Sequence, residues 1–322
     1  MRLSYAQCLE DFHLDLVLGD RPTGYYVDVG AGHPVADNVS FHAYLKGWRG
    51  LVCEPQADLA AMYSTIRPRD TVIDYLVGKA EGTVPFHRVD RLHGFSTIVE
   101  SHAKGAEQFG AGYHTEEMRI RPLAAVLAEH NAPHVDFLKI DVEGAEADVL
   151  NGMDWSKHRP SVLCIEAIEP GTMAEAWHGW EPILFAQDYL FAFSDGLNRF
   201  YIPKAEVNLL ERFPKSPTPW EVVTHFYELG RPHIRVDHPD QALTERLIKG
   251  FLATLGTASE FEIMALLEHS AGAAGLETGD ALRALLVGTA EFPGKDGMGF
   301  DDRIRAAIGR ISAQYDGGMV ND

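Results

Sequence analysis

The chain has 322 residues, 46% of them hydrophobic, which is enough for one large domain or two modest domains with apolar cores. Its formal net charge of -19 argues against a nucleic acid or an anionic membrane as a general partner, because no basic patch is visible to offset phosphate repulsion. The apolar runs are too short to insert into a membrane, and Cys8, Cys53 and Cys164 form no C-x-x-C pair, so we expect a cytoplasmic protein with free thiols and no cleavable leader.

Short apolar runs alternate with segments of helical period up to residue 204. The expected strands are YYVDV at 25–29, LVCE at 51–54, TVIDYLV at 71–77, VDFLKI at 135–140 and SVLCIEA at 161–167. Helical segments follow from Asn38, from Ala57, at 144–150 and through Trp177 and Trp180. This alternation predicts a parallel sheet with helices on both faces. Two further strands, YLFAFS and RFYI, flank an Asp195-Gly196 turn and predict a hairpin, which makes one strand antiparallel.

The character of the sequence changes after residue 204. A proline-rich joint, FPKSPTP at 213–219, precedes three segments of helical period. We therefore expect a first domain at 1–204 and a small helical C-terminal region at 205–322. That region is predicted to act as a lid, a dimer interface or a partner-binding element.

The first strand runs into D-x-G-x-G, with Asp28, Gly30 and Gly32, but Val35 stands where a dinucleotide fingerprint has its third glycine. In a dinucleotide site the pyrophosphate docks at this turn, where Asp28 would face an anion. An acid here favours a cofactor with a cationic end and no phosphate, such as S-adenosylmethionine. Glu54, 22 residues after Gly32, ends the next strand and can accept hydrogen bonds from ribose hydroxyls.

Three acids gather where the strand at 135–140 ends, at Asp141, Glu143 and Glu146. Glu146 is explained by the dipole of the helix that it begins. Asp141 instead faces the ligand-binding edge of the sheet, where it can orient a hydroxyl, accept its proton or hold a divalent ion, in that order of preference. Glu166 closes the strand at 161–167 at the same edge. A metal is not predicted, and Asp141 with Glu166 is the expected pair if one binds.

These residues belong to a series of blocks that resembles the FkbM-type S-adenosylmethionine-dependent methyltransferases. The blocks occur in the family's order over residues 4–203: SYAQ with Glu10-Asp11, YYVDVGAGHP, GWRGLVCEP, RPRD at 67–70, GFST at 94–97, VDFLKIDVEGAE, RPSVLCIEA and SDGLNRFYI. The resemblance implies a class I (Rossmann-like) methyltransferase fold, with seven strands of which one is antiparallel. It implies methyl transfer to an oxygen of a sugar, a glycan or a glycosylated natural product.

Carried over by position, the resemblance also implies roles for single residues. The cofactor would be lined by Gln7, Asp28, Gly30, Gly32, Asn38 and Glu54, with Asp141 between it and the acceptor. Apart from the resemblance, the residues themselves make Asp141, Glu143 and the loop histidines His33, His93 and His114 candidates for the base. Of the histidines, His93 is the best placed, because its loop follows a strand and the adjacent Ser96 and Thr97 can hydrogen-bond a polar acceptor. His33 would lie at the rim of the cofactor site. Ser96, Thr97, Asn198 and Arg199 are the candidate substrate contacts.

Two other classes of function stay open at this point. A nicotinamide-dependent oxidoreductase would share the fold, although it should have the third glycine. A binding module derived from a methyltransferase would need no catalytic acids, whereas this chain keeps them. The partners that we expect are a small-molecule or glycan hydroxyl acceptor and a second copy of the chain.

Overall fold

The computed structural model describes residues 3–90, 93–169, 172, 174–219 and 222–225, with the single positions 246, 250 and 259. At its centre is a seven-stranded sheet of order β10-β11-β9-β8-β2-β3-β4. The strands are β2 (Tyr25–Val29), β3 (Arg49–Cys53), β4 (Thr71–Ile73), β8 (Phe137–Ile140), β9 (Val162–Glu166), β10 (Tyr189–Ser194) and β11 (Asn198–Pro203). β11 runs against the direction of the other six strands of this sheet, because the tight turn at Asp195-Gly196 sends the chain back along β10. The predicted sheet and hairpin are confirmed.

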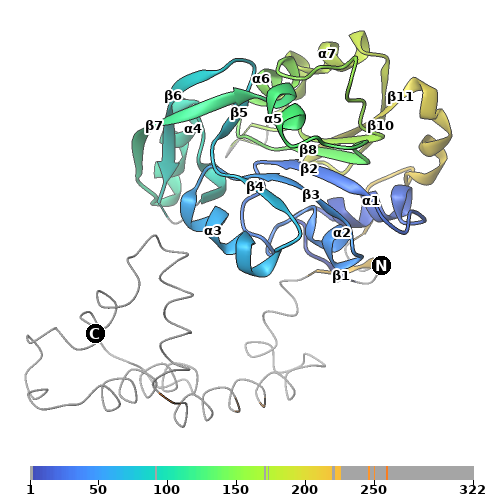
Figure 1. The fold of residues 1–322 in the computed structure, drawn as a ribbon, viewed down its shortest axis with the longest axis horizontal. Coiled ribbons are helices and arrows are strands. Elements are labelled where there is room, and N and C mark those ends of the chain that lie inside the picture. Colours follow the sequence, from blue (N-terminus) through green and yellow to red (C-terminus); the bar gives the residue numbers. More distant parts are fainter. Residues whose placement is uncertain are drawn as a thin grey trace, which may run out of the picture. The chain divides into compact units, whose positions relative to one another are not determined.

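Helices cover both faces of this sheet (Figure 1). On one face lie α5 (Leu123–Glu129), α6 (Glu146–Asn151) and α7 (Glu181–Ala186), and on the other lie α1 (Glu10–Leu18), α2 (Phe41–Leu45) and α3 (Ala57–Ile66). Alternate residues of a strand point to opposite faces, so Val27 packs in the first apolar layer and Tyr26 in the second. Both layers are well buried, which fixes the register of the strands between them.

A second sheet was not predicted from the sequence. It has the order β5-β7-β6 and is built from β5 (Leu76–Gly78), β6 (Gly82–Val89) and β7 (Tyr113–Pro122). The expected single strand at 71–77 is therefore wrong: the chain leaves the central sheet after Ile73 and enters the second sheet at Leu76. Between β6 and β7 lie η1 (His93–Phe95), α4 (Glu100–Gly105) and η2 (Ala106–Phe109).

The expected helix through Trp177 and Trp180 is also different in detail. Trp177 begins a short 3-10 helix, η3 (Trp177–Gly179), and Trp180 precedes α7. The Trp180 side chain is buried in the apolar layer of α5 to α7. Cys53 and Cys164 are buried free thiols, as predicted.

The chain divides into two compact units, Met1–Phe226 and Tyr227–Asp322. The sequence placed this boundary after residue 204, but η4 (Lys204–Arg212) packs on the first unit through the buried Leu209. The short strand β12 (Thr224–His225) pairs with β1 (Leu3–Ser4). The helical segments predicted beyond residue 226 lie outside the described residues, apart from single positions. No helix of the described part has the length and apolar character needed to cross a membrane.

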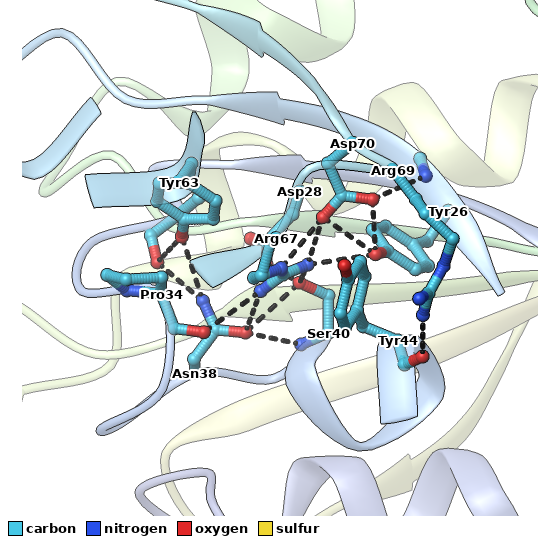
Figure 2. Close-up of polar contacts among 12 residues, drawn as sticks. Tyr26, Asp28, Pro34, Asn38, Ser40, Tyr44, Tyr63, Arg67, Arg69 and Asp70 are labelled. Carbon is cyan, nitrogen blue, oxygen red and sulfur yellow. Dashed lines mark hydrogen bonds and ion pairs between the residues drawn. The ribbon is translucent and has the colours of Figure 1, made fainter. Parts of the chain in front are cut away.

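The buried side chain of Arg67 connects β2 to neighbouring segments of the chain through hydrogen bonds (Figure 2). Arg67 and Asp70, from the predicted RPRD block, form a fully buried ion pair at 2.7 Å. The Arg67 guanidinium also donates to Asn38 Oδ1 at 2.8 Å, and to the hydroxyls of Tyr26 and Ser40 at 2.9 Å each. Because Asp70 accepts from Tyr26 and from the amide of Gly50, this network connects β2, β3 and the segment before α2.

Replacing Arg67 by alanine should therefore destabilise the first unit strongly. It leaves Asp70 buried without its cation, a change that costs about 3–5 kcal/mol. Arg69 provides a matched control, because it is exposed, stacks on Tyr44 at 3.8 Å from the ring centroid and donates a hydrogen bond to the Tyr44 carbonyl oxygen. Urea unfolding should show a loss of about 1 kcal/mol or less for Arg69→Ala. Equal losses in the two variants would contradict a structural role for the buried pair.

Candidate functional site

The candidate site lies along the edge at which the parallel strands of the central sheet end, here called the carboxyl edge. The register aligns Val29 with Cys53 and Ile140, and Ile140 with Ile165. The next residue of each strand therefore emerges at the same edge. These residues are Gly30, Glu54, Asp141 and Glu166, which the sequence singled out separately.

The glycine turn lies against the loop that follows β8. Gly30 has a φ of 76°, and a Cβ on it would lie 1.7 Å from the carbonyl oxygen of Asp141. Gly32 has a φ of 60°, but a Cβ there would meet no atom within 4 Å. Gly30 is thus required by a close approach of two backbones, whereas Gly32 is required only by its conformation.

Glu54 holds this turn from the neighbouring strand. Its Oε2 accepts a hydrogen bond from the amide of Gly32 at 2.8 Å, and its Oε1 accepts from the amide of Gln56 at 2.8 Å. Burial raises the pKa of Glu54 from 4.5 to about 7, although these two amides oppose the rise. The predicted ribose acid therefore lies directly beside the glycine turn.

A buried lysine that the sequence reasoning did not select connects the acids of the edge. Lys139 Nζ lies 2.5 Å from the carbonyl oxygen of Gly30, 3.5 Å from Asp28 Oδ1 and 3.3 Å from Asp141 Oδ2. Burial alone would lower the pKa of Lys139, but the carboxylates of Asp141 and Asp28 outweigh it and raise this pKa above its usual value. Lys139 is therefore a charged ammonium inside the sheet.

Asp28 lies beneath the turn rather than on its surface. Its side chain is fully buried, and Oδ2 accepts a hydrogen bond from the Ser40 hydroxyl at 2.6 Å. Asp141 is placed differently, since its side chain is 33% exposed. Of the two acids that Lys139 contacts, Asp141 is thus the one that can reach a bound molecule.

Asp141 is part of a cluster with Glu143 and Glu166. One carboxylate oxygen from each lies within 4.8 Å of the others. Burial, reinforced by Asp141, raises the pKa of Glu143 and that of Glu166 well above 4.5. The structure therefore brings together three of the four predicted catalytic residues.

The loop after β8 is held by contacts from distant parts of the chain. Glu143 has a φ of 56°, and its carbonyl oxygen accepts hydrogen bonds from Thr97 Oγ1 at 2.8 Å and from His102 Nδ1 at 2.9 Å. Glu146 accepts from the amides of Val142 and Gly144 in the same loop. His102 was not foreseen, and because it lies 41 residues from Glu143, no local pattern indicated it.

Two of the residues predicted to bind the cofactor, His33 and Asn38, make hydrogen bonds to nearby parts of the chain. His33 Nδ1 accepts from the amides of Val35 at 3.1 Å and Ala36 at 3.0 Å, so its ring shapes the turn. Asn38 is buried, and its amide donates to the carbonyl oxygen of Ala31 at 2.9 Å while its Oδ1 accepts from Arg67. Gln7 is exposed in the segment before α1.

The predicted substrate contacts lie at separate places. Ser96 Oγ accepts from the amide of Val89 and donates to Gln56 Oε1 at 3.3 Å, near Glu54, whereas Thr97 supports the loop after β8. Asn198 pairs with Glu166 across β11 and β9 and donates to Glu10 Oε1 at 2.7 Å.

Arg199, the next residue of β11, points to the opposite face. There its guanidinium donates to Glu181 at 2.8 Å and stacks over Trp177 at 3.9 Å. The structure therefore separates Arg199 from Asn198.

The two remaining histidines that were predicted as candidate bases are His114 and His93. His114 lies exposed on β7, 3.7 Å from Asp90. His93 begins η1, and its side chain lies outside the described residues.

The turn is not built for a pyrophosphate. In dinucleotide-binding folds the glycine turn leads directly into a helix whose N-terminus holds the phosphates. Here α2 does not begin until Phe41, and Ser40, which precedes it, donates to the buried Asp28. The carboxyl edge instead presents acids, which attract a cation and accept hydrogen bonds from hydroxyls.

The order of the central sheet, its single antiparallel strand and the acids of the carboxyl edge define a class I, Rossmann-like methyltransferase fold. Residues 28–191, just over half of the chain, match the family described as the methyltransferase FkbM domain. The chain belongs to this family.

The chain is also similar to a solved structure titled methyltransferase FkbM from Methylobacillus flagellatus KT, with 18% identity and a TM-score of 0.35. That match covers 56% of this chain and 44% of the other, so the chain spans less than half of it. No curated protein matches the chain.

The two glycines of the turn should respond differently to alanine. Gly32→Ala introduces only the strain of a positive φ, about 1–3 kcal/mol. Gly30→Ala adds a collision with the backbone of Asp141, which forces the loop after β8 to move. Urea unfolding should show the larger loss for Gly30→Ala, and a larger loss for Gly32→Ala would contradict the close approach.

Glu54 should make stability depend on pH in a defined window. Because its folded pKa of about 7 lies above 4.5, the folded state binds more protons between these values, and the free energy of unfolding falls as pH rises through them. The contribution of Glu54 is about 3 kcal/mol over the window. Urea unfolding at pH 5 and 7.5 should show a smaller fall for Glu54→Gln than for the wild type. The exposed Glu117→Gln should keep the wild-type fall, and an equal fall in all three proteins would refute this pKa.

Proposed function

We propose that the protein is an S-adenosylmethionine-dependent O-methyltransferase that acts on a hydroxyl of a sugar, a glycan or a glycosylated natural product. Membership of the FkbM family supports the methyl transfer. The observation that carries the choice of an oxygen acceptor is the position of Asp141. It is a partly exposed carboxylate at the end of a central strand, beside the glycine turn and two further acids.

The residues of the turn fit a cofactor with a cationic amino-acid end and a ribose. Glu54 accepts two amides at the end of β3 and has lone pairs that ribose hydroxyls can use. The backbone at Gly30 and Gly32 forms the floor of this site. S-adenosylmethionine supplies an electrophilic methyl group on a sulfonium, and the acids of the carboxyl edge favour its positive charges. Lys139 offsets only part of the negative charge of these acids.

The chain's own residues would then position and deprotonate the acceptor. In the transfer, a lone pair of the acceptor oxygen forms the new bond to the methyl carbon while the carbon–sulfur bond breaks, and the hydroxyl proton passes to a base. Asp141 is our candidate for this base because Lys139 holds its side chain at 3.3 Å and a third of that side chain is exposed. Holding the oxygen about 3 Å from the methyl carbon provides most of the acceleration, several kcal/mol. A base adds about 10²- to 10⁴-fold.

A nicotinamide-dependent oxidoreductase is the second candidate of similar fold, and the position of α2 argues against it. The glycine turn presents no helix N-terminus to a pyrophosphate, and the third glycine is absent. A binding module without catalysis would have no need of an Asp141 whose side chain is held in place and partly exposed. These two observations favour the methyltransferase.

Asp141→Asn should reduce methyl transfer by about 10²- to 10⁴-fold while leaving the fold intact. The substitution keeps the size of the side chain and removes the base. The measurement is incorporation of label from S-adenosylmethionine into a panel of sugars, glycosylated metabolites and cell-envelope glycans. Asp148→Asn is the matched control, since Asp148 lies on α6 and pairs with Lys79 away from the edge. Full activity of Asp141→Asn would remove Asp141 from the mechanism.

A further inference from the structure

The cluster of Asp141, Glu143 and Glu166 brings carboxylates from two strand ends to one point. Asp141 and Glu143 follow β8, and Glu166 ends the neighbouring β9. One oxygen from each lies within 4.8 Å of the other two. Like charges at this distance repel strongly in a partly buried site, so the arrangement needs a compensating positive charge or bound protons.

Two oxygens of this cluster have no hydrogen-bond partner. Oε2 of Glu143 and Oε2 of Glu166 are both sealed from solvent and have no hydrogen-bond donor among the described residues. The Glu166 carboxyl group otherwise makes a side-chain hydrogen bond only within the cluster, with Asp141. A buried acceptor left in this way destabilises the folded protein, and more so when it is charged. Two such oxygens beside a third carboxylate indicate a ligand that the protein's own donors do not replace.

Lys139 does not supply the missing charge to all three acids. Its ammonium contacts Asp141, Asp28 and the carbonyl oxygen of Gly30. Glu146, the fourth acid of this loop, accepts two backbone amides and is already satisfied. The oxygens without a donor therefore belong to Glu143 and Glu166.

The positions of these acids are fixed before any ligand binds. The carbonyl oxygen of Glu143 is held by Thr97 and His102, which keeps this residue in its left-handed conformation. Glu166 is the last residue of β9 and is aligned with Asn198 of β11. Rigid placement on strand ends lowers the entropic cost of binding an ion.

We propose that Asp141, Glu143 and Glu166 bind a divalent cation of the hard, oxygen-preferring type, with Ca²⁺ or Mg²⁺ as the representative ions. The three ligands are all carboxylates, without the imidazole or thiolate that favours zinc or copper. Opposite ligands of Ca²⁺ lie about 4.6–5.2 Å apart and those of Mg²⁺ about 4.0–4.2 Å apart. The 4.8 Å spread suits Ca²⁺ directly and suits Mg²⁺ after a small contraction.

The role of this cation rests on the proposed function, although its binding does not. A cation at Asp141 would coordinate the acceptor hydroxyl and lower the pKa of that hydroxyl. Asp141 would then act as a ligand of the cation, and the hydroxyl proton would pass to water. The oxygen would form its bond to the methyl carbon while the carbon–sulfur bond of the cofactor breaks. This gives a weakly acidic sugar hydroxyl the activation that a carboxylate alone provides less well.

The test is calorimetric titration of the full chain with CaCl₂ and with MgCl₂, after dialysis against a chelator and without S-adenosylmethionine. We expect one site per chain, and at least a tenfold weaker dissociation constant in Glu166→Gln. Glu143→Gln should show the same loss and decides the matter if Glu166→Gln does not fold. Glu117→Gln, which removes an exposed carboxylate of β7, should bind as the wild type does. Absence of binding for both ions, or wild-type affinity in the cluster variants, overturns the proposal.

Binding of S-adenosylmethionine, measured on the same samples, separates this inference from the proposed function. If S-adenosylmethionine binds but neither cation does, the cation site is wrong and the methyltransferase proposal stands. If a cation binds in the cluster but S-adenosylmethionine does not, the cation site stands and the proposed function is wrong.

Discussion

The buried ammonium of Lys139 is the interaction on which the candidate site depends. Lys139 lies on the central strand β8. Its ammonium contacts the carbonyl oxygen of Gly30 in the glycine turn, the buried Asp28 and the partly exposed Asp141. A buried charge is costly unless it is paired, so this ammonium can persist only while β2 and β8 keep their register. The same contacts place Asp141 beside the turn.

A second buried cation, Arg67, connects the network of Lys139 to residues that lie away from the carboxyl edge. Ser40 receives a hydrogen bond from Arg67 and donates to Asp28, so the networks of Arg67 and Lys139 meet at one carboxylate. Asn38, expected to line the cofactor, lies within the first network and fixes the segment between the turn and α2. The turn therefore has a rigid base, and the partly exposed Asp141 lies beside it.

The sequence predicted the parts of this site that follow from strand ends. Gly30, Glu54, Asp141 and Glu166 each follow or end an apolar run, and parallel strands bring such residues to one edge. Lys139 was overlooked because a single lysine within an apolar strand gives no periodic signal. The contacts of Thr97 and His102 with Glu143 join residues 46 and 41 positions apart, and the second sheet was hidden in strands with many polar residues. Strand alternation could have separated Asn198 from Arg199, since neighbouring residues point to opposite faces.

We propose that the carboxyl edge binds a cationic cofactor without phosphates. Parallel calorimetric titrations of the wild-type chain with S-adenosylmethionine and with NAD test it most directly. We expect S-adenosylmethionine to bind at one site per chain and NAD not to bind, because acids line the edge and no helix N-terminus faces the turn. Binding of NAD without binding of S-adenosylmethionine would contradict it.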